Sequence, residues 1–205
     1  MIDLYLAPTA NGLRASVALE ECGLAYRLHR IDIAKGENRT PEFLKLNPAG
    51  LIPVIVDHEG PGGKPMTLSQ SGAIILYAAE KSGRFLPKDP ATRYQALQWF
   101  LQAASDVAGT SGTVFRVENS APEKSAANAD YFKNRLLTFF RDCDRQLEGR
   151  EFLAGEISVA DLMLYPGFAA RKAIVDAAGG CANLQRWGKT MAARPGTQRG
   201  MNPGA

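Results

Sequence analysis

The sequence predicts an α/β domain over residues 1–82, a linker over 83–91 and an all-helical domain over 92–205. Two observations predict this division. Strand-like and helix-like segments alternate in the first part, with Gly- and Pro-rich turns between them. After the segment SGRFLPKDP, every long segment carries apolar residues at helical spacing.

The first part has a recognisable order of strands and helices. Four segments alternate or run apolar as strands do: 2–7, 26–33, 52–57 and 66–68. Three helices are expected among them: one that ends at Gly23, one that starts at Thr40-Pro41, and one over about 70–81. The order strand, helix, strand, helix, strand, strand, helix is that of a thioredoxin-like domain.

The second part reads as helices throughout. Apolar residues recur at helical spacing in two stretches: Leu97, Leu101 and Ala104, then Leu136, Phe140, Cys143 and Leu147. Ser158-Val159-Ala160-Asp161 is a helix start of the capping-box kind, with Asp in place of the usual Glu, and Pro166 is expected to kink that helix. Residues 110–126 are expected to be irregular, and the Gly- and Pro-rich residues 194–205 are expected to form a loose tail.

Charge and composition exclude several classes of protein. The 24 basic and 21 acidic residues are spread along the chain without a basic cluster interleaved with aromatics, so no nucleic acid partner is expected. No apolar run is long enough for a bilayer and no secretory signal is visible, so we expect a cytoplasmic protein with no membrane partner. No P-loop or dinucleotide motif indicates a nucleotide.

The residue types that bind metals are not grouped as a metal site would require. Cys22, Cys143 and Cys181 fit no disulfide framework or CxxC motif and read as small buried apolar residues. His29 and His58 have no Cys or acidic partner at ligand spacing, so surface roles are expected for both and no metal is expected.

Ile52-Pro53 is the first candidate for a binding site. A proline that opens an apolar strand after an Asn-Pro-x-Gly turn is a candidate for a cis peptide bond. Such a bond would turn the backbone N–H and C=O of Ile52 toward a groove, where an extended peptide could pair with them. The alternative is an ordinary edge-strand proline, and this feature alone does not decide between the two.

Gln70-Ser71 forms the second candidate, at the start of a helix that follows a strand. The Ser71 hydroxyl and the N–H groups of the first helical turn can bind a carboxylate, which the helix dipole also favours. A plain serine N-cap is the alternative. A strand-edge proline and an anion-binding helix start suit a ligand with a peptide backbone and an amino-acid-like end.

Thr9-Ala10-Asn11-Gly12 links the first strand to the first helix. In a thioredoxin-like domain this loop lies beside the proline turn. A ligand thiol placed there could be stabilised as thiolate by the Thr9 hydroxyl, the Asn11 amide and the helix N–H groups. A free thiol has a pKa of about 8.5, and each unit of lowering corresponds to about 1.4 kcal/mol, which two or three such hydrogen bonds can supply. Simple capping by Thr9 and Asn11 is the alternative.

Three motifs together resemble the glutathione S-transferase family. Asn47-Pro48-Ala49-Gly50-Leu51-Ile52-Pro53-Val54-Ile55 is similar to the family's segment with the cis-proline, and Gln70-Ser71-Gly72-Ala73-Ile74 is similar to the segment that holds the γ-glutamyl end of glutathione. Ser158 to Asp161 matches the family's folding cap. The resemblance covers nearly the whole chain and implies a thioredoxin-like domain, a helical domain, glutathione as co-substrate and a homodimer.

Within the family, Thr9-Ala10-Asn11-Gly12 is similar to the opening of the bacterial Nu class, which is associated with glutathione-dependent disulfide reduction. Ala10 departs from that pattern, which has Pro there. The resemblance implies that Thr9 and Asn11 contact the sulfur, that Asn38, Gln70 and Ser71 contact the ends of glutathione, and that Ile52 contacts the cysteinyl backbone. No Cys stands in the first loop, so the attacking thiolate would be that of glutathione itself.

The function predicted from the sequence is therefore a glutathione-dependent disulfide-bond oxidoreductase, with no metal or nucleotide cofactor. Conjugation of glutathione to small electrophiles is the first alternative. A non-catalytic module that binds glutathione and serves a regulatory role is the second.

Overall fold

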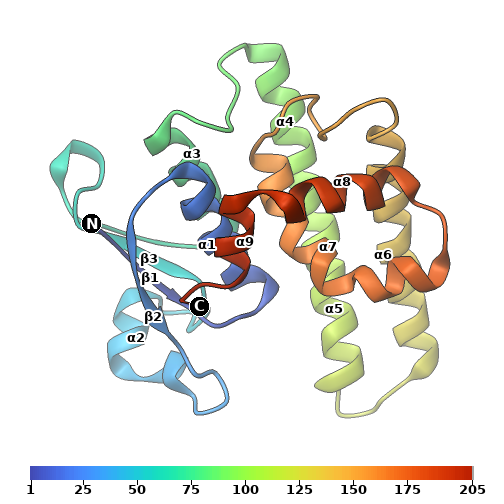
Figure 1. Ribbon diagram of the computed structural model, residues 1–205. Helices are drawn as coiled ribbons and strands as arrows, with labels where there is room; N and C mark the ends of the chain where they lie inside the picture. The colour runs from blue at the N-terminus through green and yellow to red at the C-terminus, as the bar shows by residue number, and fades with distance from the viewer. Residues whose placement is uncertain (205) are drawn as a thin grey trace. The chain divides into compact units, whose positions relative to one another are not determined.

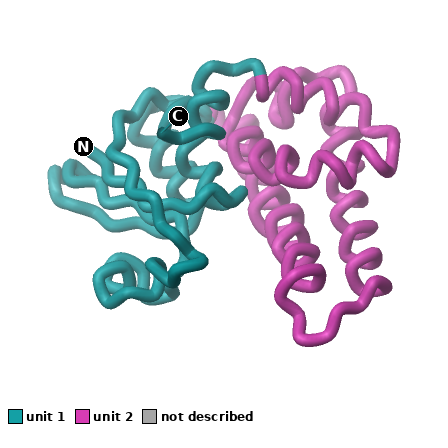
Figure 2. Tube along the Cα trace, turned by 60° about the horizontal axis from the view of Figure 1, so that its bottom comes forward, with its two compact units in different colours: residues 1–86, 193–205 teal, residues 87–192 magenta. Residues whose placement is uncertain are grey.

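The computed structural model describes residues 1–204 and divides into two compact units (Figure 2). The first unit comprises Met1–Leu86 together with the segment from Ala193 onward, and the second comprises Pro87–Ala192. The first unit is thioredoxin-like and the second is helical, so the predicted fold class is confirmed.

A four-stranded mixed sheet forms the centre of the first unit (Figure 1). Its strands are β1 (Ile2–Leu6), β2 (Tyr26–Arg30), β3 (Val54–Asp57) and β4 (Met66–Ser69), and their order is β2-β1-β3-β4. β1 pairs with β2 in parallel and with β3 antiparallel, and β3 pairs with β4 antiparallel. The parallel pair needs a crossover connection, which helix α1 (Ala10–Cys22) supplies.

The side chains of β1 alternate between the two faces of the sheet, as the pleat of a strand requires. Ile2, Leu4 and Leu6 are buried on the face that α1 and α3 (Ser71–Ser82) cover. Asp3 and Tyr5 lie on the other face, where the Tyr5 ring meets Phe43 of α2 (Pro41–Leu46) edge-on at a centroid distance of 6.4 Å. A short 3₁₀ turn, η1 (Glu37–Arg39), precedes α2, and a second, η2 (Pro61–Gly63), lies in the β3–β4 hairpin.

The second unit contains α4 (Pro90–Leu101), a π-helical segment η3 (Gln102–Val107), α5 (Ala108–Asn119), α6 (Ala126–Gln146), α7 (Val159–Ala178) and α8 (Ala182–Ala193). Its core includes edge-on aromatic pairs of Phe168 with Phe140 and with Trp187. The expectation that 110–126 is irregular is wrong for most of that range, because α5 continues to Asn119. Val107 and Val114 are fully buried, and burial of this face outweighs the low helix propensity of the glycines in between.

The predicted capping box at the start of α7 is confirmed. Ser158 accepts a hydrogen bond from the N–H of Ala160, and the Asp161 carboxylate accepts one from the N–H of Ser158 at 2.9 Å. Asp161 also accepts hydrogen bonds from the N–H of Leu153 and from the Trp187 indole. Burial raises the pKa of this carboxyl, and these hydrogen bonds oppose the rise.

The expected loose tail is instead an ordered part of the first unit. Residues Pro195–Met201 form helix α9, which packs on α1 (Figure 1). Arg194 pairs with the buried Glu21 of α1 at 2.7 Å, and the Ser16 hydroxyl donates to the carbonyl of Gly200 at 2.5 Å. A Cβ at Gly200 would lie 2.4 Å from the Cα of Val17, so glycine here permits close packing of two helices.

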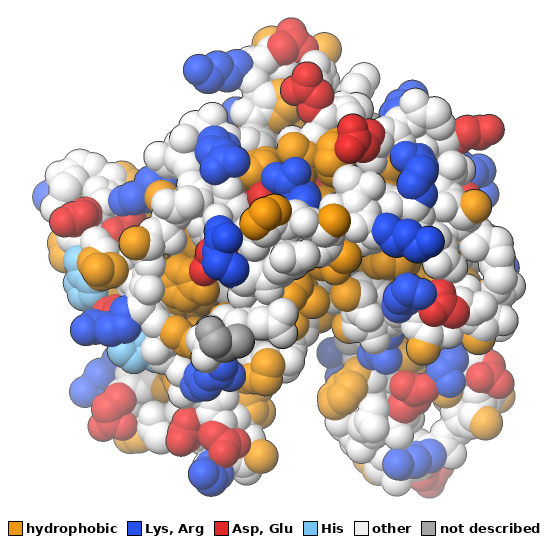
Figure 3. Space-filling view, in the orientation of Figure 1, with side chains coloured by type: hydrophobic (Ala, Val, Ile, Leu, Met, Phe, Trp, Pro, Cys, Tyr) orange, Lys and Arg blue, Asp and Glu red, His pale blue; other side chains and the backbone are white. Residues whose placement is uncertain are grey.

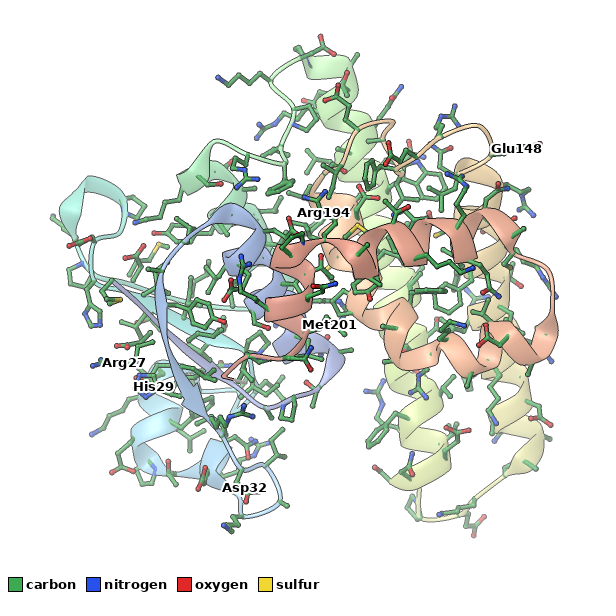
Figure 4. The ribbon with its side chains drawn as sticks, in the orientation of Figure 1. Arg27, His29, Asp32, Glu148, Arg194 and Met201 are labelled. Carbon is green, nitrogen blue, oxygen red and sulfur yellow. The ribbon has the colours of Figure 1, made fainter. Side chains whose placement is uncertain are left out.

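The two histidines, whose side chains are partly exposed, share an acidic partner that their spacing in the sequence does not indicate. His29 Nε2 lies 3.0 Å and His58 Nε2 2.8 Å from the carboxylate of Asp3, which is 3% exposed. Arg27 donates two further hydrogen bonds to the same carboxylate, and Figure 4 shows Arg27 and His29 side by side on β2. The strand pairing of β1 with β2 and β3 brings these side chains together, although up to 55 residues separate them in sequence.

Charges of both signs are interspersed on the face of the molecule drawn in Figure 3. Among residues 1–204, no helix combines the length and apolarity needed to cross a bilayer. In the same range, His, Cys, Asp and Glu side chains form no group of three suited to a metal ion.

Candidate glutathione site

A small hollow of about 90 Å³ lies in the first unit, where three connecting segments of the chain meet. Its lining residues are Asn11, Asn47, Leu51, Ile52, Pro53, Gln70 and Ser71. The structure thus brings together five residues that the sequence marked as site candidates. The other two candidates, Thr9 and Asn38, are not among the lining residues, although Thr9 lies two residues before Asn11.

Thr9 caps the N-terminal end of α1, next to the hollow. It is the N-cap of α1, and its hydroxyl accepts a hydrogen bond from the N–H of Gly12 at 3.2 Å. Gly12 is needed because a Cβ there would lie 2.1 Å from the carbonyl oxygen of Ala7. The close approach places the first turn of α1 directly against the end of β1, and Thr9 itself stays exposed.

Asn11 lies exposed in the first turn of α1 and lines the hollow. Its carbonyl oxygen accepts a hydrogen bond from a guanidinium nitrogen of Arg14, one turn further along the same helix. Arg14 is 2% exposed, and burial lowers its pKa to about 10, which still leaves the guanidinium charged at neutral pH. A buried cation thus holds the Asn11 side chain in position.

Two buried asparagines hold the loop that carries Ile52-Pro53. The Asn47 amide donates to the carbonyl of Leu51 at 2.7 Å, and the Asn38 amide donates to the carbonyl of Gly50 at the same distance. The peptide bond between Ile52 and Pro53 is cis, which decides between the two alternatives that the sequence left open. Asn38 therefore holds this loop without lining the hollow.

Gln70 and Ser71 line the hollow at the start of α3. Gln70 has a φ of 73°, a left-handed conformation that non-glycine residues adopt at a cost of about 1–3 kcal/mol. Its side chain makes no capping hydrogen bond, while its carbonyl accepts one from the N–H of Ile74 at 3.0 Å. Ser71 is buried at this first turn. Backbone strain of this kind is typical of sites where a side chain must face a ligand.

The hollow is electrostatically suited to anions. The N-terminal ends of α1 and α3 both lie at it, and the N–H groups of a first helical turn carry partial positive charge. One helix start can stabilise a thiolate and the other a carboxylate, while the loop before Pro53 can pair with an extended peptide.

Comparison with known proteins assigns the chain to a family. The profile of the glutathione S-transferase N-terminal domain matches residues 10–81, and that of the glutathione S-transferase C-terminal domain matches residues 106–199. The chain belongs to the glutathione S-transferase family. Among curated relatives of this glutathione S-transferase, the disulfide-bond oxidoreductase YfcG of Escherichia coli is 38% identical over 81% of this chain and 78% of its own length. The disulfide-bond oxidoreductase YghU of the same species is 32% identical over 97% and 73%.

Solved structures of glutathione transferases resemble the present one over its whole length. The Pseudomonas putida enzyme, with one glutathione disulfide per subunit, has a TM-score of 0.91 and 34% identity, covering 100% of this chain and 92% of that chain. The Burkholderia graminis enzyme, with two glutathione molecules per subunit, has a TM-score of 0.91 and 33% identity, covering 99% and 88%.

Sequence reasoning missed three residues at or next to the hollow of this glutathione S-transferase. Asn47 and Leu51 line the hollow, and Arg14 supports Asn11 from within α1. Asn47 looked like an ordinary turn residue, because its bond to Leu51 forms only in the folded loop. A signal for Arg14 was available, since a charged residue on the apolar face of a predicted helix indicates a buried partner.

Proposed function

We propose that this glutathione S-transferase binds glutathione in the hollow and uses the glutathione thiolate to reduce disulfides. The observation that carries the proposal is the meeting of two helix N-termini and the Ile52-Pro53 loop at one hollow. Glutathione has matching chemistry, because it offers a thiol, an extended peptide backbone and an amino-acid-like end with a carboxylate.

Except for Thr9, the proposed contacts use residues that line the hollow. Thr9 and Asn11, at the start of α1, would face the sulfur, and Ile52 with Pro53 would pair with the cysteinyl backbone. Gln70 and Ser71 would hold the γ-glutamyl end at the start of α3. For Asn38, whose amide is engaged by Gly50, we propose that it holds the loop in the shape that glutathione requires; the sequence had indicated a direct contact.

The proposed reaction has two exchange steps. The glutathione thiolate attacks one sulfur of the disulfide, so that a mixed disulfide forms, the old S–S bond breaks and a thiolate leaves. A second glutathione thiolate then attacks the glutathione sulfur of the mixed disulfide, which yields glutathione disulfide and releases the second thiolate of the substrate. The substrate gains two electrons, and the protons lost by two glutathione thiols reach the two leaving thiolates through solvent. The relatives with one glutathione disulfide or two glutathione molecules per subunit support this stoichiometry.

The finer assignments belong to the same proposal. The Thr9-Ala10-Asn11-Gly12 opening and the two oxidoreductase relatives support the Nu class.

A homodimer is supported by large apolar side chains that are more than half exposed, among them Leu51, Leu101, Phe115 and Tyr131. A cytoplasmic location is supported by free cysteines at positions 22, 143 and 181, because oxidising compartments favour disulfides.

Turnover of two substrates tests the reaction. We expect the protein with glutathione to reduce a mixed disulfide of glutathione and 2-mercaptoethanol much faster than it conjugates 1-chloro-2,4-dinitrobenzene. The physical reason is that a sulfur electrophile needs only a stabilised thiolate, which the hollow supplies. Robust conjugation with negligible disulfide reduction would overturn the ranking, and retention on immobilised glutathione without either activity would favour a non-catalytic binding module.

A substitution at Ser71 tests the binding site. Ser71→Ala removes a hydroxyl that the proposal places on a carboxylate, a hydrogen bond that contributes about 1.5–3 kcal/mol. The dissociation constant for glutathione, measured by calorimetry, is therefore expected to rise about 10- to 100-fold. Ser125→Ala is the control: Ser125 also lies at the start of a helix, as the N-cap of α6 with its oxygen accepting from the N–H of Asn128, but it belongs to the second unit. Equal affinities in the Ser71 variant and the wild type would remove Ser71 from the site.

A further inference from the structure

Arg14 is a buried charge whose position the proposed reaction does not by itself explain. It lies on α1 three residues after Asn11, so the two side chains share one face of the helix. Burial of a guanidinium is costly unless its donors are paired, and one of them donates to the Asn11 carbonyl oxygen.

The bond between Arg14 and Asn11 determines which end of the Asn11 amide faces the hollow. A guanidinium has donors and no acceptor, so it must face the carbonyl oxygen of the amide and cannot face its NH₂ group. Asn11 also lines the hollow. With the oxygen engaged by Arg14, the group that Asn11 can present to a ligand there is its NH₂ donor.

We propose that Arg14 is a positioning residue that locks the Asn11 amide with its N–H donors toward the glutathione sulfur and its oxygen away from it. This inference rests on the proposed binding of glutathione in the hollow. A thiolate is stabilised by an N–H donor and repelled by a carbonyl oxygen, so the orientation of one amide changes the pKa of the bound thiol. Without Arg14, the amide can rotate and present its oxygen.

The positive charge of Arg14 also favours the thiolate form of the bound sulfur. A cation behind the amide polarises the Asn11 side chain, because a hydrogen bond accepted by its oxygen strengthens the hydrogen bonds donated by its nitrogen. Arg14 therefore need not touch the sulfur to affect it.

The experiment is a pH titration of glutathione bound to the protein, followed by the ultraviolet absorbance of the thiolate. In Arg14→Met, the pKa of the bound thiol is expected to rise by about one unit, which leaves about 10-fold less thiolate at a pH below both pKa values. Asn11→Ala is expected to raise it by a similar amount. The double variant is expected to show no further rise, because Arg14 acts through Asn11.

Two further variants keep the test informative if Arg14→Met does not fold. Asn11→Asp retains an acceptor for Arg14 and removes the donor toward the sulfur, so the thiol pKa is expected to rise at least as far as in Asn11→Ala. Arg14→Lys retains a cationic donor, so the pKa of the bound thiol is expected to rise less in this variant than in Arg14→Met.

Arg194→Met is the matched structural control. Like Arg14, Arg194 donates a guanidinium hydrogen bond to a side chain of α1, but its acceptor is the carboxylate of Glu21 at the other end of the helix. The thiol pKa is expected to be unchanged in this variant. A folded Arg14→Met protein with an unchanged thiol pKa, or an Asn11→Asp protein that keeps the low pKa, overturns the inference. Failure of the wild type to bind glutathione in calorimetry contradicts the proposed function instead.

Discussion

A few residues of the first unit are in energetically unfavourable states, either a strained backbone conformation or a buried charge. Gln70 takes a left-handed conformation at the hollow, where glycine would be free of strain. Arg14 and Asp3 are charged and buried, and each is compensated by hydrogen bonds from particular partners. At this scale the chemistry of the site and the stability of the first unit depend on a few side chains.

Asp3 gives a stability prediction with a defined pH dependence. Hydrogen bonds, above all from Arg27 and also from His58 and His29, hold the pKa of the Asp3 carboxyl well below its usual range. Because the folded pKa is below the unfolded value of about 3.9, the stabilisation is fully present above that pH and is lost as the pH falls below it.

We therefore expect Asp3→Asn to lower the free energy of unfolding by about 1–3 kcal/mol at pH 7, with a smaller difference from wild type below pH ~4. Urea unfolding at several pH values measures this. Asp130→Asn is the control, because Asp130 is exposed and its ion pair with Lys133 spans 4.0 Å; a change within about 0.5 kcal/mol is expected. A pH-independent difference for Asp3→Asn would show that its charge is not what stabilises the fold.

Among the elements, α1 connects the site to the rest of the first unit. Its N-terminal turn carries Thr9 and Asn11, and its middle and C-terminal turns pack against α3 and α9. Glu21 accepts hydrogen bonds from Arg194 and Thr197, and Arg199 pairs with Glu20 at 2.7 Å. Figure 4 labels Arg194, which precedes α9, and Met201, the last residue of α9. The C-terminal helix is thus part of the support of the site.

Gly200→Ala tests this role of α9. The new Cβ would lie 2.4 Å from the backbone of Val17, so α9 must shift away from α1. The free energy of unfolding is expected to fall by about 1–3 kcal/mol, as for overpacking in a core, in thermal or urea unfolding. Gly109→Ala is the matched control, since a Cβ there meets nothing within 4 Å, and helix propensity predicts a gain of up to about 1 kcal/mol. Equal stabilities of the two variants would contradict close packing of α9 on α1.

At the scale of the whole molecule, each unit has its own core, and the candidate hollow lies entirely within the first. The chain starts in the first unit, forms the second unit, and returns to the first at Ala193. A division by sequence position alone therefore places residues 193–204 with the helical part, although they complete the α/β part.

Local patterns in the sequence determined the fold class, most helix starts and the main site motifs. Thr9, Ser158 and Pro53 act on their immediate chain neighbours, so caps, the proline turn and strand alternation can be inferred without coordinates.

Only the tertiary structure determined which residues hold these motifs in place. The pairs Asp3 with His58 and Ser16 with Gly200 join residues 55 and 184 positions apart, and no local pattern records which partners such a distance will join. The same holds for Asn38 and Asn47, whose bonds to loop carbonyls exist once the loop has folded back on itself. Local propensity depends on neighbours along the chain, whereas burial and pairing of a polar group depend on which surfaces meet. For this reason the sequence indicated the residues of the proposed glutathione site, and the structure showed which hydrogen bonds hold them in place.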